Sequence, residues 1–228
     1  MADAQTLSSR AGRLTLVVAI LASGTGFLMN SAVTIALPTI QSSLDTSMSG
    51  IQWVVNAYSL MLGALILVSG ALGDIYGVRR VFNAGLLIFS GGSLLAAAAP
   101  SVPLLVAVRA VQGIGAALMV PGSLAIINNT FRQEERGRVI GLWAGISGAI
   151  AALGPFIGGF LAEISWRLVF LAMAPFGLSA YAFSRAVIPR VVSRSHRSLD
   201  LPGAVMVLLA LLGLATTLIR LPGASWDA

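Results

Sequence analysis

The chain has 228 residues, of which 57% are hydrophobic and 10% are charged, and its formal net charge is +6. A composition this apolar lies outside the range of soluble domains and indicates a protein that crosses a membrane several times. The long continuous apolar runs exclude a transmembrane barrel, whose strands alternate over about ten residues, so we expect an all-α membrane protein.

The charged and metal-ligating residues exclude several other classes of function. All basic residues are arginines, and most lie in short gaps between apolar runs, so we expect no nucleic-acid surface. The chain has no cysteine, and its single histidine, His196, lies in a basic loop without a ligand partner in sequence. No protease or hydrolase motif and no intramembrane carboxylate pair is present, so we expect no metal, no cofactor and no enzyme activity.

The first predicted span covers Leu14–Pro38 and follows a polar tail, residues 1–13. Ser23, Asn30 and Thr34 recur at helical spacing and share one face of this span. Polar faces inside a membrane point to a bundle interior or to a cavity. The alternative is hydrogen bonding between helices without any ligand.

The second predicted span, Ile51–Leu72, carries a similar polar face. The residues of this face are Gln52, Asn56, Ser59 and Gly63. Two polar faces in consecutive spans favour a cavity over simple helix–helix hydrogen bonding, although each single residue fits either interpretation.

A charged, glycine-rich turn is expected at Gly70–Arg80, between the second span and a third span at Val81–Ala99. Its glycines permit close packing and positive φ, which a tight turn needs. These glycines are Gly70, Gly73 and Gly77, and the charged residues of the turn are Asp74, Arg79 and Arg80. One interpretation is a basic loop that only sets the topology.

The fourth predicted span, Pro103–Ile127, contains Arg109, the one charge well inside an apolar run. A charged side chain in a membrane is costly and is a functional hypothesis by default. The alternative is that Arg109 extends to the nearby interface while its stem stays in lipid. Gln112 lies one helical turn away and could share its hydrogen bonds.

The fifth predicted span, Val139–Leu161, ends with Gly154-Pro155-x-x-Gly158-Gly159. A proline inside a helix frees a carbonyl and bends the helix, and glycines let a neighbouring helix approach closely. A sixth span at Arg167–Val187 and a seventh at Leu201–Ile219 follow. We expect a cytoplasmic tail (1–13), a six-helix bundle (14–190), a cytoplasmic linker (191–200) and a seventh transmembrane helix with a short tail (201–228).

The distribution of arginines predicts the orientation, because positive charge is enriched on the cytoplasmic side. With the N-terminus inside, the outer segments hold only Arg167 and Arg220. The inner segments then hold Arg10, Arg13, Arg79, Arg80, Arg132, Arg136, Arg138, Arg185, Arg190, Arg194 and Arg197. We therefore expect a multi-pass protein of the plasma membrane, in bacteria the inner membrane, with a cytoplasmic N-terminus.

Three of these motifs resemble signatures of the major facilitator superfamily, in the same order and in the corresponding spans. Gly70–Arg80 matches the pattern G-x-L-x-D-x-x-G-x-R-R between its second and third spans. Arg109, Gln112 and the glycines after them resemble its fourth-span pattern, R-x-x-Q-G-x-G-x-A. The stretch Gly154–Gly159 resembles the motif of its exporters. The end of the first span is similar to the fourteen-helix drug:proton antiporter branch, although Met29 stands where that branch has an acidic residue.

The resemblance implies the N-terminal half of such a transporter: two inverted three-helix repeats with a seventh, inserted helix. It implies proton-coupled efflux of amphipathic small molecules by alternating access. Arg109 and Gln112 would then tune the pathway, Gly70–Arg80 would latch the inner face, and Gly154–Gly159 would bend the fifth helix. The predicted pathway lining consists of Asn30, Thr34, Gln52 and Asn56.

One half cannot enclose a cavity, so the expected partners are the lipid bilayer, a small-molecule substrate, and a missing C-terminal half or a second subunit. No Asp or Glu lies in the middle of a predicted span, so the proton-carrying group is not visible in the sequence. Uptake of a polar solute and a truncated, non-transporting membrane module stay as alternatives.

Overall fold

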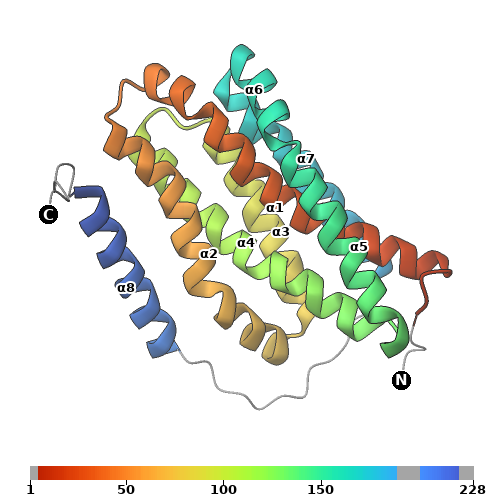
Figure 1. Cartoon of the computed structure of the whole chain (residues 1–228). Coiled ribbons are helices and arrows are strands. Elements are labelled where there is room, and N and C mark those ends of the chain that lie inside the picture. The colour runs from red at the N-terminus through yellow and green to blue at the C-terminus, as the bar shows by residue number, and fades with distance from the viewer. Residues whose placement is uncertain (1–4, 189–200, 221–228) are drawn as a thin grey trace, which may run out of the picture.

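The computed structural model describes residues 5–188 and 201–220 of the chain. The regular elements of these residues are helices, apart from an isolated bridge between Gln5 and Phe131 (Figure 1). The helices are α1 (Arg10–Ser43), α2 (Met48–Tyr76), α3 (Val78–Ala97), α4 (Val102–Thr130), α5 (Gln133–Ala152), α6 (Gly154–Ile164), α7 (Trp166–Val187) and α8 (Leu201–Arg220). The predicted all-α fold is confirmed.

Six segments of the described chain are long and apolar enough to cross a membrane. They are α1, most of α2, α3, α4, the continuous segment Gln133–Ile164 that joins α5 and α6, and α7. The protein is therefore a multi-pass membrane protein, as predicted. α8 occupies the position of the predicted seventh span, and its apolar part, Val205–Thr217, is shorter than the other six.

Serine side chains cap the first turns of three helices. The hydroxyl of Ser9 accepts a hydrogen bond from the backbone N–H of Gly12 at 3.0 Å at the start of α1. Ser47 accepts one from Gly50 at 3.2 Å at the start of α2. These caps satisfy N–H groups that have no partner within the helix. They lie outside the apolar runs, which explains why α1 and α2 begin before the predicted spans.

Two predicted helix ends are wrong. α1 continues past Pro38 to Ser43. Pro38 is exposed in the last two turns of the helix, and the fully buried Ile40 after it holds the end of the helix in place. α2 continues through Gly70 and Asp74 to Tyr76, so the predicted turn Gly70–Arg80 is helical almost throughout. The real turn is Gly77 alone, whose φ of 91° lies in the left-handed region that glycine tolerates.

The fifth span is broken near its middle. α5 ends at Ala152 and α6 begins at Gly154, with Leu153 between them. The break precedes Pro155, which lies in the first turn of α6, where its missing N–H costs no hydrogen bond. The sequence predicts a bend caused by this proline, and the structure places the interruption directly before it.

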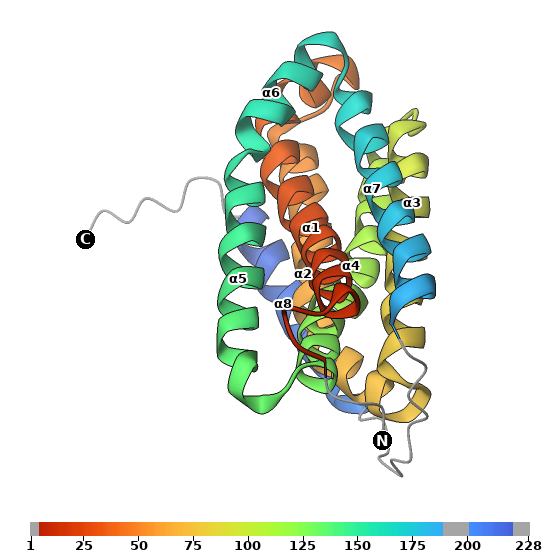
Figure 2. The ribbon, with the colours of Figure 1, turned by 90° about the vertical axis from the view of Figure 1, so that its right-hand side faces the viewer.

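The six spans form two interlocked repeats, α1–α3 and α4–α7. α1 packs against α5, α6 and α7 of the second repeat, and α4 packs in the corresponding way against α2 and α3 of the first. Figure 2 shows α3 and α7 on one flank and α5 with α6 on the opposite flank, with α1 and α4 between them. Because each repeat has three spans, the second repeat crosses the membrane in the inverted sense, as predicted.

Glycines bring α4 close to its neighbours. A methyl group at Gly85 of α3 would lie 2.7 Å from the carbonyl oxygen of Gly115 in α4, and Gly115 meets the backbone of Phe89 in the same way. On the other side, Gly113 of α4 lies directly against the backbone of Tyr58 in α2. Small residues at helix interfaces permit such backbone contact in membranes. This close packing encloses Arg109 of α4, whose contacts with other helices lie in α2 and α7.

The last described helix, α8, packs along α2 on the outside of the bundle (Figure 1). Leu211 of α8 faces Gly63 of α2, where a methyl group would meet its side chain at 3.9 Å. The predicted linker 191–200 and the tail after residue 220 lie outside the described residues. The same holds for His196 and for the predicted inner arginines Arg190, Arg194 and Arg197.

Candidate functional site

Arg109 is fully buried in the bundle, with an exposed fraction of 0%. Its Nε donates a hydrogen bond to the carbonyl oxygen of Val54 in α2 at 3.1 Å. Its Nη1 donates to Oε1 of Gln112, one turn along α4, at 3.2 Å. Arg109 therefore points inward, and the alternative that it extends to the nearby interface is wrong.

The hydrogen bonds continue from Gln112 into α3. The side-chain amide of Gln112 donates to the hydroxyl of Ser93 at 2.9 Å, and Ser93 donates to the carbonyl oxygen of Phe89 at 2.9 Å. The chain of polar contacts thus crosses three helices, from α2 through α4 to α3. All of these side chains are buried, so the network fixes the position of the guanidinium relative to the bundle.

Aromatic rings, not carboxylates, surround the charge of Arg109. Its guanidinium carbon lies 4.3 Å from the ring centroid of Tyr58 and 6.0 Å from that of Phe170. Cation–π contacts of this kind gain strength where water is absent. Among the charged residues of 5–188 and 201–220 whose exposure the structure describes, Arg109 alone is buried. Its Nη2 is buried without a hydrogen-bond partner.

A groove of about 530 Å³ lies next to this network, on the face formed by α1, α2, α5 and α6. Asn30 and Thr34 of the polar face of α1 line it, as do Tyr58 of α2 and Pro155 of α6. Its remaining lining residues are Gly26, Phe27, Ser31, Ile35, Leu62 and Ala151. The groove therefore has a mixed surface, mostly apolar with a few polar groups, which suits an amphipathic ligand.

Tyr58 connects the groove to the buried arginine. Its ring contacts the guanidinium of Arg109 and also lines the groove. Its hydroxyl donates a hydrogen bond to the carbonyl oxygen of Gly26 in α1 at 3.2 Å, which ties α2 to α1. A ligand in the groove would thus contact the residue that separates it from Arg109.

Two residues of the polar face predicted on α2, Gln52 and Asn56, do not line the groove. Gln52 is exposed and Asn56 is half-buried. Tyr58 replaces them as the α2 contribution to the groove. Tyr58 and Ser93 are not among the site residues predicted from the sequence. Both are polar residues inside apolar spans, which is the signal the sequence offers, but neither belongs to a longer polar face.

The motif at Gly154–Gly159 packs α6 onto α1. A methyl group at Gly154 would lie 2.5 Å from Cβ of Ser31, and one at Gly158 would lie 2.5 Å from the carbonyl oxygen of Ala32. Gly159 has room for a methyl group, with Ile35 at 3.7 Å. Gly154 and Gly158 therefore make the backbone contacts, while Pro155 lies exposed beside them in the groove.

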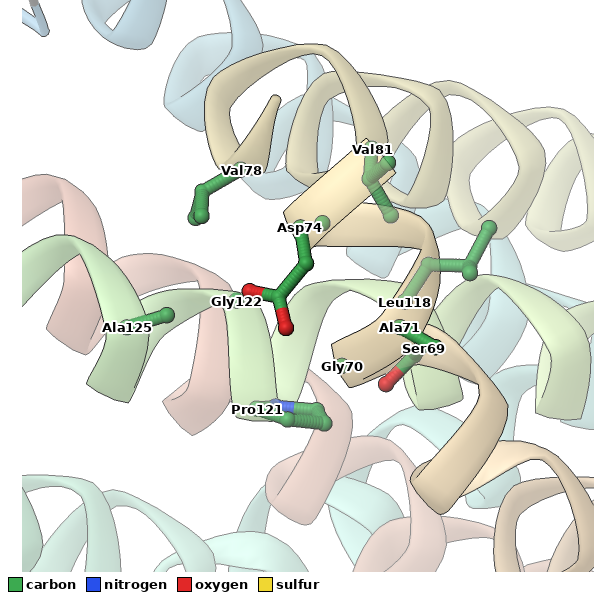
Figure 3. A pocket seen from close by; sticks show the side chains of 11 residues that line it. Ser69, Gly70, Ala71, Asp74, Val78, Val81, Leu118, Pro121, Gly122 and Ala125 are labelled. Carbon is green, nitrogen blue, oxygen red and sulfur yellow. The ribbon is translucent and has the colours of Figure 1, made fainter. Parts of the chain in front are cut away.

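The motif at Gly70–Arg80 forms a second, separate site at the other end of α2. A hollow of about 310 Å³ lies between the end of α2, the start of α3 and α4. Figure 3 shows the carboxylate of Asp74 projecting into it toward α4, where Pro121 and Gly122 lie. Gly70 and Gly73 line the same hollow. This site does not meet the groove, so the predicted residues form two groups.

The two arginines of the motif lie on the far side of the turn. Arg79 donates through Nη2 to the carbonyl oxygen of Arg185 at the end of α7, at 2.7 Å. Arg80 is exposed at the start of α3. No group of three or more His, Cys, Asp or Glu in the described chain could hold a metal ion.

Comparison with known proteins agrees with this architecture. The Major Facilitator Superfamily profile matches residues 19–226. The chain is 38% identical to a methylenomycin A resistance protein of Bacillus subtilis over 207 residues, which cover 88% of this chain and 44% of the relative. It is 34% identical to the tetracenomycin C resistance and export protein of Streptomyces glaucescens, covering 91% of this chain and 40% of the relative.

A solved structure of a peptide transporter, POT, superimposes with a TM-score of 0.70 at 16% identity and covers 94% of this chain and 46% of that structure. At this identity the likeness concerns the fold alone. The chain spans about half the length of the curated relatives that it matches. The profile covers most of the chain, and the relatives exceed 30% identity over most of it. The chain therefore belongs to the Major Facilitator Superfamily.

Proposed function

We propose that this chain forms the N-terminal half of a secondary active transporter that exports amphipathic small molecules by alternating access, driven by the proton gradient. The relatives described above are resistance proteins, and one of them is named as an export protein. The interrupted fifth span supports the same direction, since it carries the glycine–proline motif that resembles the superfamily's exporters. The protein would move its substrate without converting it chemically.

The observation that carries the proposal is the position of Tyr58 between the groove and Arg109. A substrate bound beside Asn30 and Thr34 would contact the Tyr58 ring, and a movement of this ring would change the surroundings of the guanidinium. Arg109 cannot itself carry a proton, because a guanidinium does not deprotonate in proteins. Its proposed role, with Gln112, is to tune the pathway electrostatically.

A complete transporter of this type needs a second six-helix half. The groove is open on its outer side, since Phe27, Asn30 and Thr34 are exposed. We propose that a C-terminal half or a second subunit covers this face and encloses the substrate. No Asp or Glu is buried among the described residues, so the proton-carrying carboxylate would come from that second half.

We further propose that the N-terminus is cytoplasmic, in a bacterial inner membrane. In that orientation the hollow around Asp74 lies at the inner face. Asp74 and the glycines Gly70 and Gly77 would then latch the two halves at this face when the transporter opens outward. Arg79 and Arg80 would anchor the start of α3 beside this latch.

Transport direction in sealed vesicles tests the proposal. In everted vesicles that contain the native protein, we expect a fluorescent amphipathic cation to accumulate when a proton gradient is imposed. The double variant Asn30→Ala/Thr34→Ala should reduce the initial rate several-fold, because it removes the polar groups of the groove. Gln52→Ala/Asn56→Ala is the matched comparison, since it removes two polar residues of α2 that do not line the groove.

Each outcome has a distinct meaning. Accumulation in right-side-out vesicles alone would overturn export and favour the uptake of a polar solute. Absence of any transport, with Arg109→Ala and Asp74→Asn causing no phenotype, would favour a non-transporting membrane module. The intact mass of the protein from its native membrane separates the two sources of the second half: a mass near 23.5 kDa requires a second subunit, and about twice that mass indicates a C-terminal half in the same chain.

A further inference from the structure

A basic hollow lies between α3 and α7, on the flank opposite α5 (Figure 2). Its volume is about 370 Å³. It is lined by Arg79, Arg80, Asn83, Ala84, Leu87, Tyr181 and Arg185. None of these residues lines the groove beside Tyr58 or the hollow around Asp74, so this site is separate from both.

Hydrogen bonds hold the arginines of the two helices side by side. Arg79 of α3 donates to the carbonyl oxygen of Arg185 of α7, at 2.7 Å. Arg185 donates in turn through Nη1 to the hydroxyl of Tyr181 at 3.0 Å. Beneath them, the hydroxyl of Ser184 donates to Oδ1 of Asn83 at 2.6 Å in a buried contact between the same helices. The hollow therefore has a fixed floor, and two of its three arginines, Arg79 and Arg185, are held by hydrogen bonds.

The charge of this hollow calls for an anion. Of the described residues that line it, three are arginines and none is an Asp or a Glu. Like charges this close repel one another, and the repulsion is stronger beside a membrane than in bulk water. Planar guanidinium groups bind phosphate oxygens through two parallel N–H donors. A phosphate group in the hollow would relieve the repulsion and accept hydrogen bonds from Arg80 of α3 and Arg185 of α7.

The surface beyond the arginines is apolar and faces outward. On α3, Ala84, Leu87 and Leu94 follow Arg80 at helical spacing, and all three are exposed. On α7, the exposed Leu178 lies one turn from Tyr181, away from the charged end. Positive charge at one end and apolar side chains toward the middle of the membrane match the two parts of a phospholipid.

We propose that this hollow binds the headgroup phosphate of an anionic phospholipid, whose acyl chains lie along the exposed faces of α3 and α7. The site would tie the two flanking helices of the two repeats to the adjacent leaflet. This inference needs only the membrane-spanning fold and the hollow itself. It does not depend on the substrate or on the direction of transport.

Native mass spectrometry of the detergent-solubilised protein tests the site, with phosphatidylglycerol and phosphatidylcholine of matched acyl chains as probes. We expect the first phosphatidylglycerol to bind more tightly than the first phosphatidylcholine. The double variant Arg80→Gln/Arg185→Gln should weaken phosphatidylglycerol binding roughly 25-fold, because each arginine near an anionic headgroup contributes about a factor of 5. Binding of phosphatidylcholine should not change.

The matched control is Arg10→Gln/Arg138→Gln, which removes the same charge from two exposed arginines at the same end of the bundle. It should leave phosphatidylglycerol binding unchanged. The variant Arg80→Lys/Arg185→Lys should bind phosphatidylglycerol more tightly than the glutamine variant and less tightly than the native protein, because lysine keeps the charge but not the planar pair of donors. Equal weakening in both glutamine variants would reduce the effect to net charge and overturn the site. Inorganic phosphate that competes with the lipid at equal concentration would overturn the lipid as the ligand.

Discussion

The guanidinium of Arg109 is held in the membrane interior without a carboxylate partner among the described residues. Two neutral acceptors, the carbonyl of Val54 and the amide of Gln112, and the rings of Tyr58 and Phe170 surround it. Removing a charge from water without an opposite charge nearby is destabilising. A chain that retains such a group gains no stability from it, which supports the proposed role in transport.

Replacement of Arg109 by methionine should separate these two effects. Arg109→Met removes the buried charge and keeps an unbranched chain of similar size, leaving chiefly Oε1 of Gln112 without its donor. We expect the free energy of unfolding to change by no more than about 2 kcal/mol, because the loss of the two hydrogen bonds and the relieved desolvation oppose each other. Transport should fall at least about tenfold. Thermal unfolding in detergent and vesicle transport measure the two quantities.

Arg109→Lys serves as the comparison, because it keeps the charge but loses the planar group that stacks on Tyr58 and bonds Gln112. We expect partial transport, between the native protein and Arg109→Met. Native transport rates in Arg109→Met would contradict a role in the pathway. They would leave Arg109 as a packing residue only.

The sequence was sufficient to single out Arg109 and Gln112, because a charge and an amide one turn apart are conspicuous in an apolar run. It was not sufficient for Tyr58 or Ser93. Tyrosine is common near the ends of spans, and a single serine can bond the carbonyl one turn back in its own helix, as Ser93 does to Phe89. Which of these side chains meets Arg109 depends on how α2, α3 and α4 pack, and a single-helix pattern does not contain that information.

The contact between α1 and α6 depends on two glycines of the interrupted fifth span. Gly158→Ala would bring the new methyl group to 2.5 Å from the carbonyl oxygen of Ala32, so the backbones must move apart. We expect a loss of about 1–3 kcal/mol in the free energy of unfolding, as for other overpacked positions. Thermal unfolding of the purified variant in detergent measures it.

Gly145→Ala is the matched control on α5, in the same span. A methyl group there meets nothing within 4 Å, so the substitution should be neutral or stabilise the helix by about 1 kcal/mol. A larger loss for Gly145→Ala than for Gly158→Ala would show that an unseen neighbour covers α5 and that the α1–α6 contact yields easily.

Hydropathy located the six spans but misplaced several of their ends. The apolar runs mark the part of each helix that lies in the membrane, whereas α1 and α2 continue into polar sequence at both ends, where serine caps and buried residues such as Ile40 decide the boundary. The turn between α2 and α3 shows the same effect. Three glycines were available, and only Gly77, which alone has positive φ, ends the helix.

The interlocked packing of the two repeats explains how this six-span bundle holds its shape. Each repeat supplies one central helix, α1 or α4, that is enclosed by the other repeat, so neither repeat has a complete core alone. The outer faces of α5 and α6 keep large exposed side chains, such as Leu142, Phe156 and Phe160. In the proposed transporter, lipid or the second half would cover these side chains.

The orientation of the bundle can be tested on a single span, because the chain has no cysteine of its own. Gly137 and Glu163 are exposed at opposite ends of the segment Gln133–Ile164, and a side chain at Gly137 meets no neighbour within 4 Å. Gly137→Cys and Glu163→Cys are therefore a matched pair. The excess of arginine at the end that holds Gly137 predicts that this end is cytoplasmic.

In intact cells, a membrane-impermeant maleimide should label Glu163→Cys and leave Gly137→Cys unlabelled. Permeabilised cells should label both, which shows that each cysteine is accessible and that both proteins are folded in the membrane. The reverse pattern would place the N-terminus outside. It would also move the hollow around Asp74 to the outer face, where it could not act as the proposed inner latch. The expected pattern places the hollow around Asp74 and the arginine-rich end of the bundle on the cytoplasmic side, as the proposed inner latch requires.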